Sequence, residues 1–341
     1  MELTTAWFWL IAILWIGYFV LEGFDFGVGA LLFVLGRDEP ERRAILRTIG
    51  PVWDGNEVWV LVAGGATFAA FPEWYASLFS GFYLALFLLL VALIVRGVAI
   101  EYRNKREDAR WRWRCDVAIS VASAVPALLW GVAFANIVQG VPLDAHHEFT
   151  GNLVTLLNPY ALVGGLTTLT LFLTHGALFL GLKTDGVIRR RANALAGRTG
   201  LVAAAVAVAF LAWTQQMNGD PGSLAASALA ALALVGALVA NRLRREAWAF
   251  AGTALTIVLA VVALFVALYP DVLPSTTDPA FGLTTTNAAS TPYTLGIMTG
   301  VAVVFTPLVL LYQGWTYWVF RRRVTAEAVH EDEPSGLPTA S

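Results

Sequence analysis

The sequence has few of the residues that proteins use to hold metals or form disulfides. Among its 341 residues are a single cysteine, Cys115, and four histidines. One cysteine excludes an intramolecular disulfide framework and a metal site made of cysteines alone. The histidines are too scattered to indicate a metal cluster: His146, His147, His175 and His330. We therefore expect no metal to be held by this chain.

Charged residues are also scarce. They make up 13% of the chain, whereas 58% is hydrophobic and the mean hydropathy is +0.67. A typical soluble domain has about 25% charged residues. The composition excludes an ordinary soluble protein and predicts an all-α integral membrane protein. No nucleic-acid partner is expected.

Apolar runs of the roughly 20 residues needed to cross a bilayer predict nine transmembrane helices. The first run continues through GFDFGVGALLF, so we interpret it as a retained helix rather than a cleaved signal peptide. The predicted spans are Ala6–Leu35, Val52–Phe71, Tyr75–Ile100, Asp116–Ile137, Tyr160–Leu182, Gly200–Met217, Ser223–Ala240, Trp248–Tyr269 and Pro292–Phe320.

Alternate loops between these spans contain no basic residue. All 22 Lys and Arg residues fall on the other side or at helix ends facing it. By the positive-inside rule, the N-terminus is outside and the C-terminus is cytoplasmic, which requires an odd number of spans. Residues 1–322 are expected to form the transmembrane domain. The acidic, proline-bearing residues 323–341 are expected to form a disordered cytoplasmic tail.

Four acids stand out against this apolar background. An ionisable side chain at the centre of a membrane helix costs about 2.5–3.5 kcal/mol, so it normally faces protein or water and has a function. Glu22 and Asp25, in LEGFDFGVG, are three residues apart and share a helix face. Gly23 and Gly27 form a small-xxx-small pair, which predicts that another helix backbone approaches closely here.

The second span begins with GPVWDGNEVWV. This places Asp54 and Glu57 in its first two turns near the cytoplasm, where the helix dipole favours the ionised carboxylate. With Glu22 and Asp25 two or three turns deeper on a neighbouring helix, the acids predict a proton path into the protein. Three neighbours are expected to form a packed polar site around them: Trp53, Asn56 and Trp59.

Structural roles are the alternative. Asp54 and Glu57 would then cap their helix and pair with Arg47 or Arg96. Arg96 and Glu101 lie at the inner end of the third span and suit interface anchoring by snorkelling. A pair between Arg96 and a buried acid is the sharper hypothesis.

His175 lies inside the fifth predicted span, in LTHGALF. A histidine there serves as a haem ligand, as a proton carrier or as a hydrogen-bonding residue between helices. We favour the last role, because no second histidine lies inside a predicted span.

The order of several motifs resembles one membrane protein family along nearly the whole chain. These motifs are GFDFGVG, GPVWDGNEVWVLVAGGATFAAFP, FSGFYLALFLLLVALIVRGVAIEYR, THGALFLGLKTDG and FTPLVLLYQGWTYWVFR. They are similar to subunit II of cytochrome bd quinol oxidases. The resemblance implies a bacterial plasma-membrane location. It also implies nine helices, arranged as two four-helix bundles plus one extra helix.

The resemblance further implies a heterodimer in which subunit I carries haem b and haem d. This chain would be haem-free and not catalytic alone. The complex would reduce oxygen to water with four electrons from quinol, and would take protons from the cytoplasm. By position, Asp54 matches the family's acid in the proton path and Asp25 matches the acid of the first helix. The family pattern is looser at Glu57, where it accepts glutamine.

Other partners implied by the resemblance are small single-helix accessory subunits, membrane lipids and a structural quinone. The quinone, menaquinone or ubiquinone, would lie in a lateral apolar cleft that no motif identifies. Two other hypotheses compete with the oxidase interpretation. One is a scaffold that only stabilises the haem subunit. The other is a secondary transporter, although the sequence shows no clear repeat of the kind typical of transporters.

Overall fold

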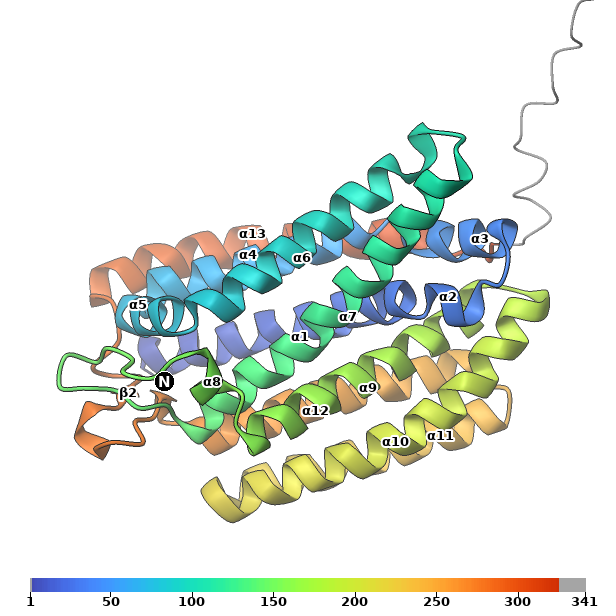
Figure 1. Ribbon diagram of the computed structural model, residues 1–341. Helices are drawn as coiled ribbons and strands as arrows, with labels where there is room; N and C mark the ends of the chain where they lie inside the picture. The colour runs from blue at the N-terminus through green and yellow to red at the C-terminus, as the bar shows by residue number, and fades with distance from the viewer. Residues whose placement is uncertain (1, 325–341) are drawn as a thin grey trace, which may run out of the picture.

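The computed structural model describes residues 2–324, and helices dominate it (Figure 1). The all-α prediction is confirmed. The long helices are α1 (Leu3–Ala30), α4 (Trp53–Ala70), α6 (Tyr83–Tyr102), α7 (Ala109–Gln139), α9 (Pro159–Lys183), α10 (Gly186–Asn218), α11 (Pro221–Arg242), α12 (Glu246–Leu268) and α13 (Pro292–Val319). The short elements are α2 (Leu32–Leu35), α3 (Glu39–Ile49), α5 (Pro72–Gly81), α8 (Leu153–Leu156), two 3₁₀ turns (Arg103–Lys105 and Pro279–Phe281) and the antiparallel strands β1 (Asp271–Leu273) and β2 (Leu283–Thr284).

Eight helices within residues 2–324 are long and apolar enough to cross a membrane. They are all of the long helices except α4. The second predicted span is helical and has 18 residues, but the polar run WDGNE at its start makes it less apolar than the others.

Two predicted spans are interrupted in the structure. The first, Ala6–Leu35, breaks at Leu31 into α1 and α2. The third, Tyr75–Ile100, breaks at Phe82 into α5 and α6. At this break the Phe82 ring is buried against Phe149 of the loop before α9, with 6.3 Å between ring centroids. Hydropathy does not reveal either break, because the residues next to each break are uncharged and mostly apolar.

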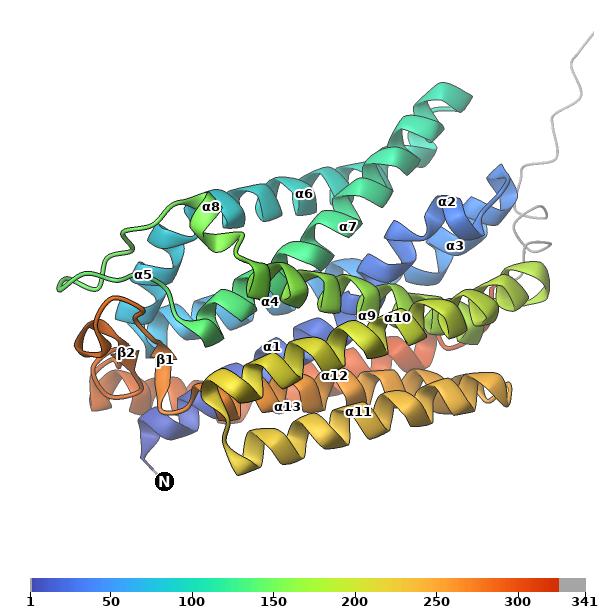
Figure 2. The same cartoon turned by 60° about the horizontal axis from the view of Figure 1, so that its bottom comes forward.

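The basic segments gather at one end of the molecule. Figure 1 shows α3, the α6–α7 turn, the α9–α10 turn and the α11–α12 turn at this end. The N-terminus lies at the other end of the molecule, the end that also holds β2 and α8 (Figures 1 and 2). The predicted separation of basic and non-basic loops is therefore seen in the fold. That the basic end faces the cytoplasm stays a prediction.

Helix α1 lies at the centre, packed against α4, α7, α9 and α12 (Figure 2). A Cβ atom on Gly27 would lie 2.0 Å from the Phe172 carbonyl oxygen and 2.9 Å from the Gly176 Cα, both in α9. A Cβ atom on Gly23 would lie 2.8 Å from the Phe172 ring. The predicted close approach of another helix backbone is confirmed at Gly27, whereas Gly23 faces the ring of Phe172.

The first two residues of the predicted tail contact the end of α9. The backbone N–H of Val324 donates to the Lys183 carbonyl at 2.8 Å, and the Arg323 side chain donates to the Thr184 carbonyl at 3.3 Å. The chain therefore stays attached to the end of α9 through Val324. The remainder of the predicted tail, residues 325–341, lies outside the described residues.

The α1–α9 contact yields a test of the packing. We expect Gly27→Ala to lower the stability of the folded subunit by about 1–3 kcal/mol, because the added methyl group meets backbone atoms that cannot move aside. Thermal unfolding of the purified protein measures this. Gly236→Ala is the control, since its Cβ would have nothing within 4 Å. Equal unfolding temperatures for the two variants would contradict the close packing.

Candidate functional site

A buried ion-pair cluster joins α1, α4 and α6. Arg96 of α6 is completely buried, and its Nη1 forms an ion pair with Glu22 of α1, which is also fully buried. The same nitrogen lies 3.3 Å from Glu57 Oε2 of α4, whose side chain is 24% exposed. The Arg96 guanidinium also lies over the rings of Phe26 and Trp53, 5.0 and 5.9 Å from their centroids. The predicted pair between Arg96 and a buried acid is present.

Asp25 belongs to the same region and contacts α4 through Asn56. The Asn56 Nδ2 donates to Asp25 Oδ2 at 2.6 Å, and both side chains are fully buried. The Asn56 side-chain oxygen, Oδ1, accepts from Gln313 Nε2 at 3.0 Å and from the Tyr317 hydroxyl at 2.8 Å. One amide therefore connects α1, α4 and α13.

No role was predicted for Gln313 and Tyr317. They are four residues apart and so lie on one face of α13. An amide and a phenol on one face of an otherwise apolar last span would have been a usable signal. Their partner on α4 was not predictable from helix spacing.

The expected depth of the acids is wrong. Asp25 hydrogen-bonds directly to Asn56 in the first turns of α4, so the two pairs of acids lie at nearly the same level. The reason is the break at Leu31. Asp25 is five residues from the end of α1, about 7.5 Å, rather than ten residues from the end of a continuous span. The acids form a compact cluster instead of a ladder.

The other predicted site residues lie around this cluster. Asp54 is exposed, and its Oδ1 accepts from the Gly55 N–H at 2.7 Å. Trp59 packs on α1 at Gly17, where a Cβ would lie 2.2 Å from the indole ring. Glu101 is exposed at the basic end and takes no part in the cluster. This position fits the interface role considered for it.

Asp54 and Glu57 open onto a groove between α4, α5 and α6. Its volume is about 810 Å³. Most of its walls are apolar, including Leu61, Phe68 and Leu90. The two carboxylates are therefore reached from the side of the protein, next to surfaces that a bilayer or another subunit would cover.

His175 of α9 bridges three helices, as favoured from the sequence. Its Nε2–H donates to the Val20 carbonyl at 3.2 Å, so its Nδ1 accepts from the Thr253 hydroxyl at 2.7 Å. The ring is fully buried and stacks on Phe250 with 4.4 Å between centroids. Both nitrogens are occupied, so His175 does not fit a haem iron. Residues 2–324 also contain no group of three or more His, Cys, Asp or Glu side chains suited to a metal ion.

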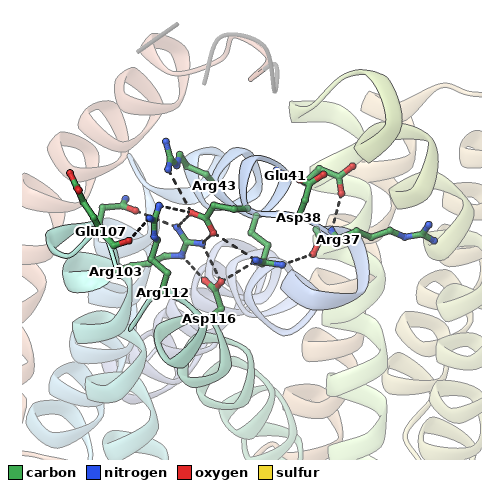
Figure 3. A network of polar contacts seen from close by, with 12 residues as sticks. Arg37, Asp38, Glu41, Arg43, Arg103, Glu107, Arg112 and Asp116 are labelled. Carbon is green, nitrogen blue, oxygen red and sulfur yellow. Dashed lines mark hydrogen bonds and ion pairs between the residues drawn. The ribbon is translucent and has the colours of Figure 1, made fainter. Parts of the chain in front are cut away.

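A second charge network lies at the basic end and was not foreseen (Figure 3). Asp116, at the start of the membrane part of α7, is completely buried. Its carboxylate binds Arg103 in a two-point contact, at 2.5 and 3.1 Å, and Arg42 at 3.0 Å. Arg103 also binds Glu39 at 2.8 Å. The network fastens α3 to the turn between α6 and α7.

Glu39 is held ionised by this network. Burial alone favours its neutral form, but the hydrogen bond and charge of Arg103, with the charges of Arg112 and Arg42, outweigh burial and lower the pKa of the Glu39 carboxyl. A lowered pKa in the folded state stabilises the fold above the usual Glu pKa of about 4.3. The contribution is lost as the pH falls from there through the folded-state pKa.

Fold and site together define a helical, multi-span membrane protein with a buried cluster of acids around one arginine. The sequence model of cytochrome bd terminal oxidase subunit II matches residues 3–320, and the chain belongs to this family.

Similar proteins agree with this assignment. Cytochrome bd-I ubiquinol oxidase subunit 2 of Escherichia coli K12 is 37% identical over 96% of this chain and 97% of its own length. Cytochrome bd ubiquinol oxidase subunit 2 of Bacillus subtilis 168 is 38% identical over 95% and 97%. A chain in the structure of bd oxidase from Geobacillus thermodenitrificans has the same fold, with a TM-score of 0.76, 18% identity and coverage of 94% of this chain and 97% of that chain.

The network at the basic end gives a stability prediction. We expect Asp116→Asn to destabilise the protein by about 3–5 kcal/mol, because it leaves the buried Arg103 without its closest counter-charge. Thermal unfolding of the purified protein measures the loss. Glu107→Gln serves as the control, since Glu107 is exposed and accepts from Arg112 through its backbone carbonyl alone. An Asp116→Asn variant as stable as this control would show that the network is not needed for the fold.

Proposed function

We propose that this chain is the haem-free subunit II of a quinol-oxidising cytochrome bd oxidase and supplies its cytoplasmic proton uptake path. Subunit I would hold haem b and haem d and reduce oxygen to water with four electrons from quinol. The relatives from E. coli and B. subtilis are ubiquinol oxidase subunits, which supports this activity. The observation that carries the proton path is the continuity from the groove at Asp54 to the buried acids.

The path begins at Asp54, which is exposed in the groove. Glu57 is one helical turn further along α4 and partly exposed, so it receives a proton from the groove side. Arg96 contacts both Glu57 and Glu22 through its Nη1, which brings the two carboxyls to the same atom of one guanidinium. Protons therefore pass between α4 and α1 without a long gap.

Two buried oxygens mark the inner positions of the path. Glu22 Oε2 and Asp25 Oδ1 have no hydrogen-bond partner within residues 2–324. Buried polar atoms normally have such a partner. Each oxygen is therefore a position that can carry a transferred proton. Asn56 holds the other oxygen of Asp25 and so orients its carboxyl group.

The groove side is the proposed docking face for subunit I. Carboxylates such as Asp54 do not face lipid tails, so another protein must cover this face. Helix α13, which borders α4, supports the choice: 6% of its most apolar stretch is buried, the least of the candidate spans. Docking here would close the acids off from the bilayer while leaving the basic end open to water.

We include α4 as a ninth transmembrane crossing. Eight crossings would bring both ends of the described chain to one side, whereas they lie at opposite ends of the molecule (Figure 1). Helix α4 has 18 residues, about 27 Å, which nearly spans the hydrocarbon core. An external N-terminus, two four-helix bundles, accessory subunits and a structural quinone stay predictions for this chain.

The proton path predicts a selective loss of turnover. We expect Asp54→Asn to reduce quinol-dependent oxygen uptake by at least tenfold, because asparagine cannot carry a proton. Haem bands in the reduced-minus-oxidised spectrum should stay normal in the complex purified through a tag on this chain. Asp185→Asn is the matched control, since Asp185 also accepts from the next glycine N–H at the basic end but lies outside the groove.

Three results would overturn parts of the proposal. Full oxygen uptake by Asp54→Asn would exclude this acid as the proton donor. Normal activity after joint neutralisation of Asp25 and Asp54 would favour the scaffold function. A purified chain with neither partner nor haem, from membranes that express all subunits, would favour a transporter.

The docking face has its own test. We expect Leu61→Gln to reduce the amount of haem subunit that co-purifies with this chain, because Leu61 is 71% exposed in the groove. Leu232→Gln on α11 is the matched control: it is 66% exposed and faces away from the groove, so both changes carry the same cost of meeting lipid. Equal loss of the haem subunit in both variants would place the interface elsewhere.

A further inference from the structure

A second groove lies between α10 and α11, apart from the acid cluster. The turn at residues 219–220 joins the two helices, which run alongside each other to the basic end (Figure 2). The groove occupies about 610 Å³ at this end. It belongs to neither the proposed proton path nor the proposed docking face.

Three arginines surround the mouth of this groove: Arg190, Arg242 and Arg244. Within residues 2–324 their side chains form no ion pair or hydrogen bond, and no acid lines the groove. By contrast, the two sequence neighbours of Arg190 are paired with acids: Arg189 at 2.8 Å and Arg191 at 2.7 Å. The arginine that is left without a partner is the one that faces the groove.

The walls below the mouth are mostly apolar, apart from Asn193 and Asn241. Helix α10 contributes Ala194, Gly197 and Ala204, and α11 contributes Val235 and Leu238. These small side chains leave a channel along the helices. Ala204 and Val235 also line a partly open apolar cavity of about 120 Å³ between α9, α10, α11 and α12. The groove therefore leads from a cationic mouth into the apolar interior.

We propose that this groove binds one anionic phospholipid of the surrounding bilayer. The phosphodiester would lie among the three arginines, whose guanidinium groups suit phosphate oxygens. One acyl chain would run along α10 and α11 towards the cavity. Basic pockets between membrane helices on the cytoplasmic side are known to take anionic head groups, and here the charge is complementary and no acid opposes it.

The arrangement favours an anionic lipid over a neutral or zwitterionic one. A zwitterionic head group brings its own cation into a mouth that already holds three positive charges, whereas phosphatidylglycerol brings a net negative charge. Arg244 also has φ = 60°, a left-handed conformation at a helix end where glycine is the common residue. Arg244 thus lies at the mouth although a positive φ is unfavourable for an arginine backbone.

The test is native mass spectrometry of the intact complex purified through a tag on this chain. The delipidated complex is titrated with palmitoyl-oleoyl phosphatidylglycerol or with the corresponding phosphatidylcholine. We expect one phosphatidylglycerol to be retained with a clear preference over phosphatidylcholine. Each arginine removed should weaken that binding by about fivefold.

Charge-matched variants distinguish lipid binding in this groove from attraction to general surface charge. Joint replacement of Arg190, Arg242 and Arg244 by glutamine should abolish the preference. The same replacement of Arg321, Arg322 and Arg323 removes equal charge at the same end and should preserve it. Arg244→Gly should weaken lipid binding without destabilising the fold, because glycine adopts a positive φ readily.

A second pair of variants tests the acyl-chain channel. Gly197→Leu should reduce phosphatidylglycerol retention, since a Cβ there has open space apart from Asn241 Nδ2 at 3.7 Å and the side chain would fill the groove. Gly236→Leu has no atom within 4 Å of its Cβ and lies outside the groove, so it should bind lipid normally.

Three outcomes would overturn the proposal. One is equal retention of the two lipids by the unmodified complex. Another is an undiminished preference in the triple glutamine variant. The last is recovery of a quinone or an accessory polypeptide cross-linked in the groove in place of phospholipid. These readouts do not require oxidase activity, so they stand apart from the test of the proton path.

Discussion

The low dielectric constant of the bilayer is the constraint on which this structure depends. A charge that enters it must be paired or must face water, because an isolated ion there is far more costly than one in solution. Arg96 meets this requirement for α6 by contacting acids on α1 and α4 at once. Three helices that carry charge are thereby forced to meet at one level. The aromatic rings of Phe26 and Trp53 exclude lipid from the guanidinium.

The positions of the remaining helices follow from this meeting point. Helix α1 can bring its acids to α4 because Gly23 and Gly27 let α9 pack directly behind them. Asn56 then carries the contact on to α13, which otherwise touches the bundle little. The centre of the molecule is thus held by polar groups on one side of α1 and by close backbone packing on the other.

Sequence patterns predicted the features that depend on one helix at a time. Composition predicted the all-α class and most span positions. The spacing of glycines predicted the close approach at Gly27, and the scarcity of histidines in the spans favoured a bridging role for His175. Features that depend on two distant segments were missed. Asp116 looked like the polar start of a span, since its partners Arg42 and Arg103 come from other segments. The depth of Asp25 was misjudged because the break at Leu31 leaves no trace in hydropathy.

The two charge networks differ in their ratio of acids to arginines. This difference distinguishes a structural role from the role that we propose for the cluster. At the basic end, arginines outnumber acids around Asp116 and Glu39, so each of these carboxylates contacts more than one guanidinium. In the cluster, Glu22 and Glu57 share the single guanidinium of Arg96, and Asp25 accepts from the Asn56 amide. One oxygen each of Glu22 and Asp25 has no hydrogen-bond partner in the described chain. An excess of acids in a low-dielectric region is relieved when a proton arrives and restored when it leaves. A network that is fully paired holds helices together, whereas one that is short of positive charge has the acid excess that the proposed proton path requires.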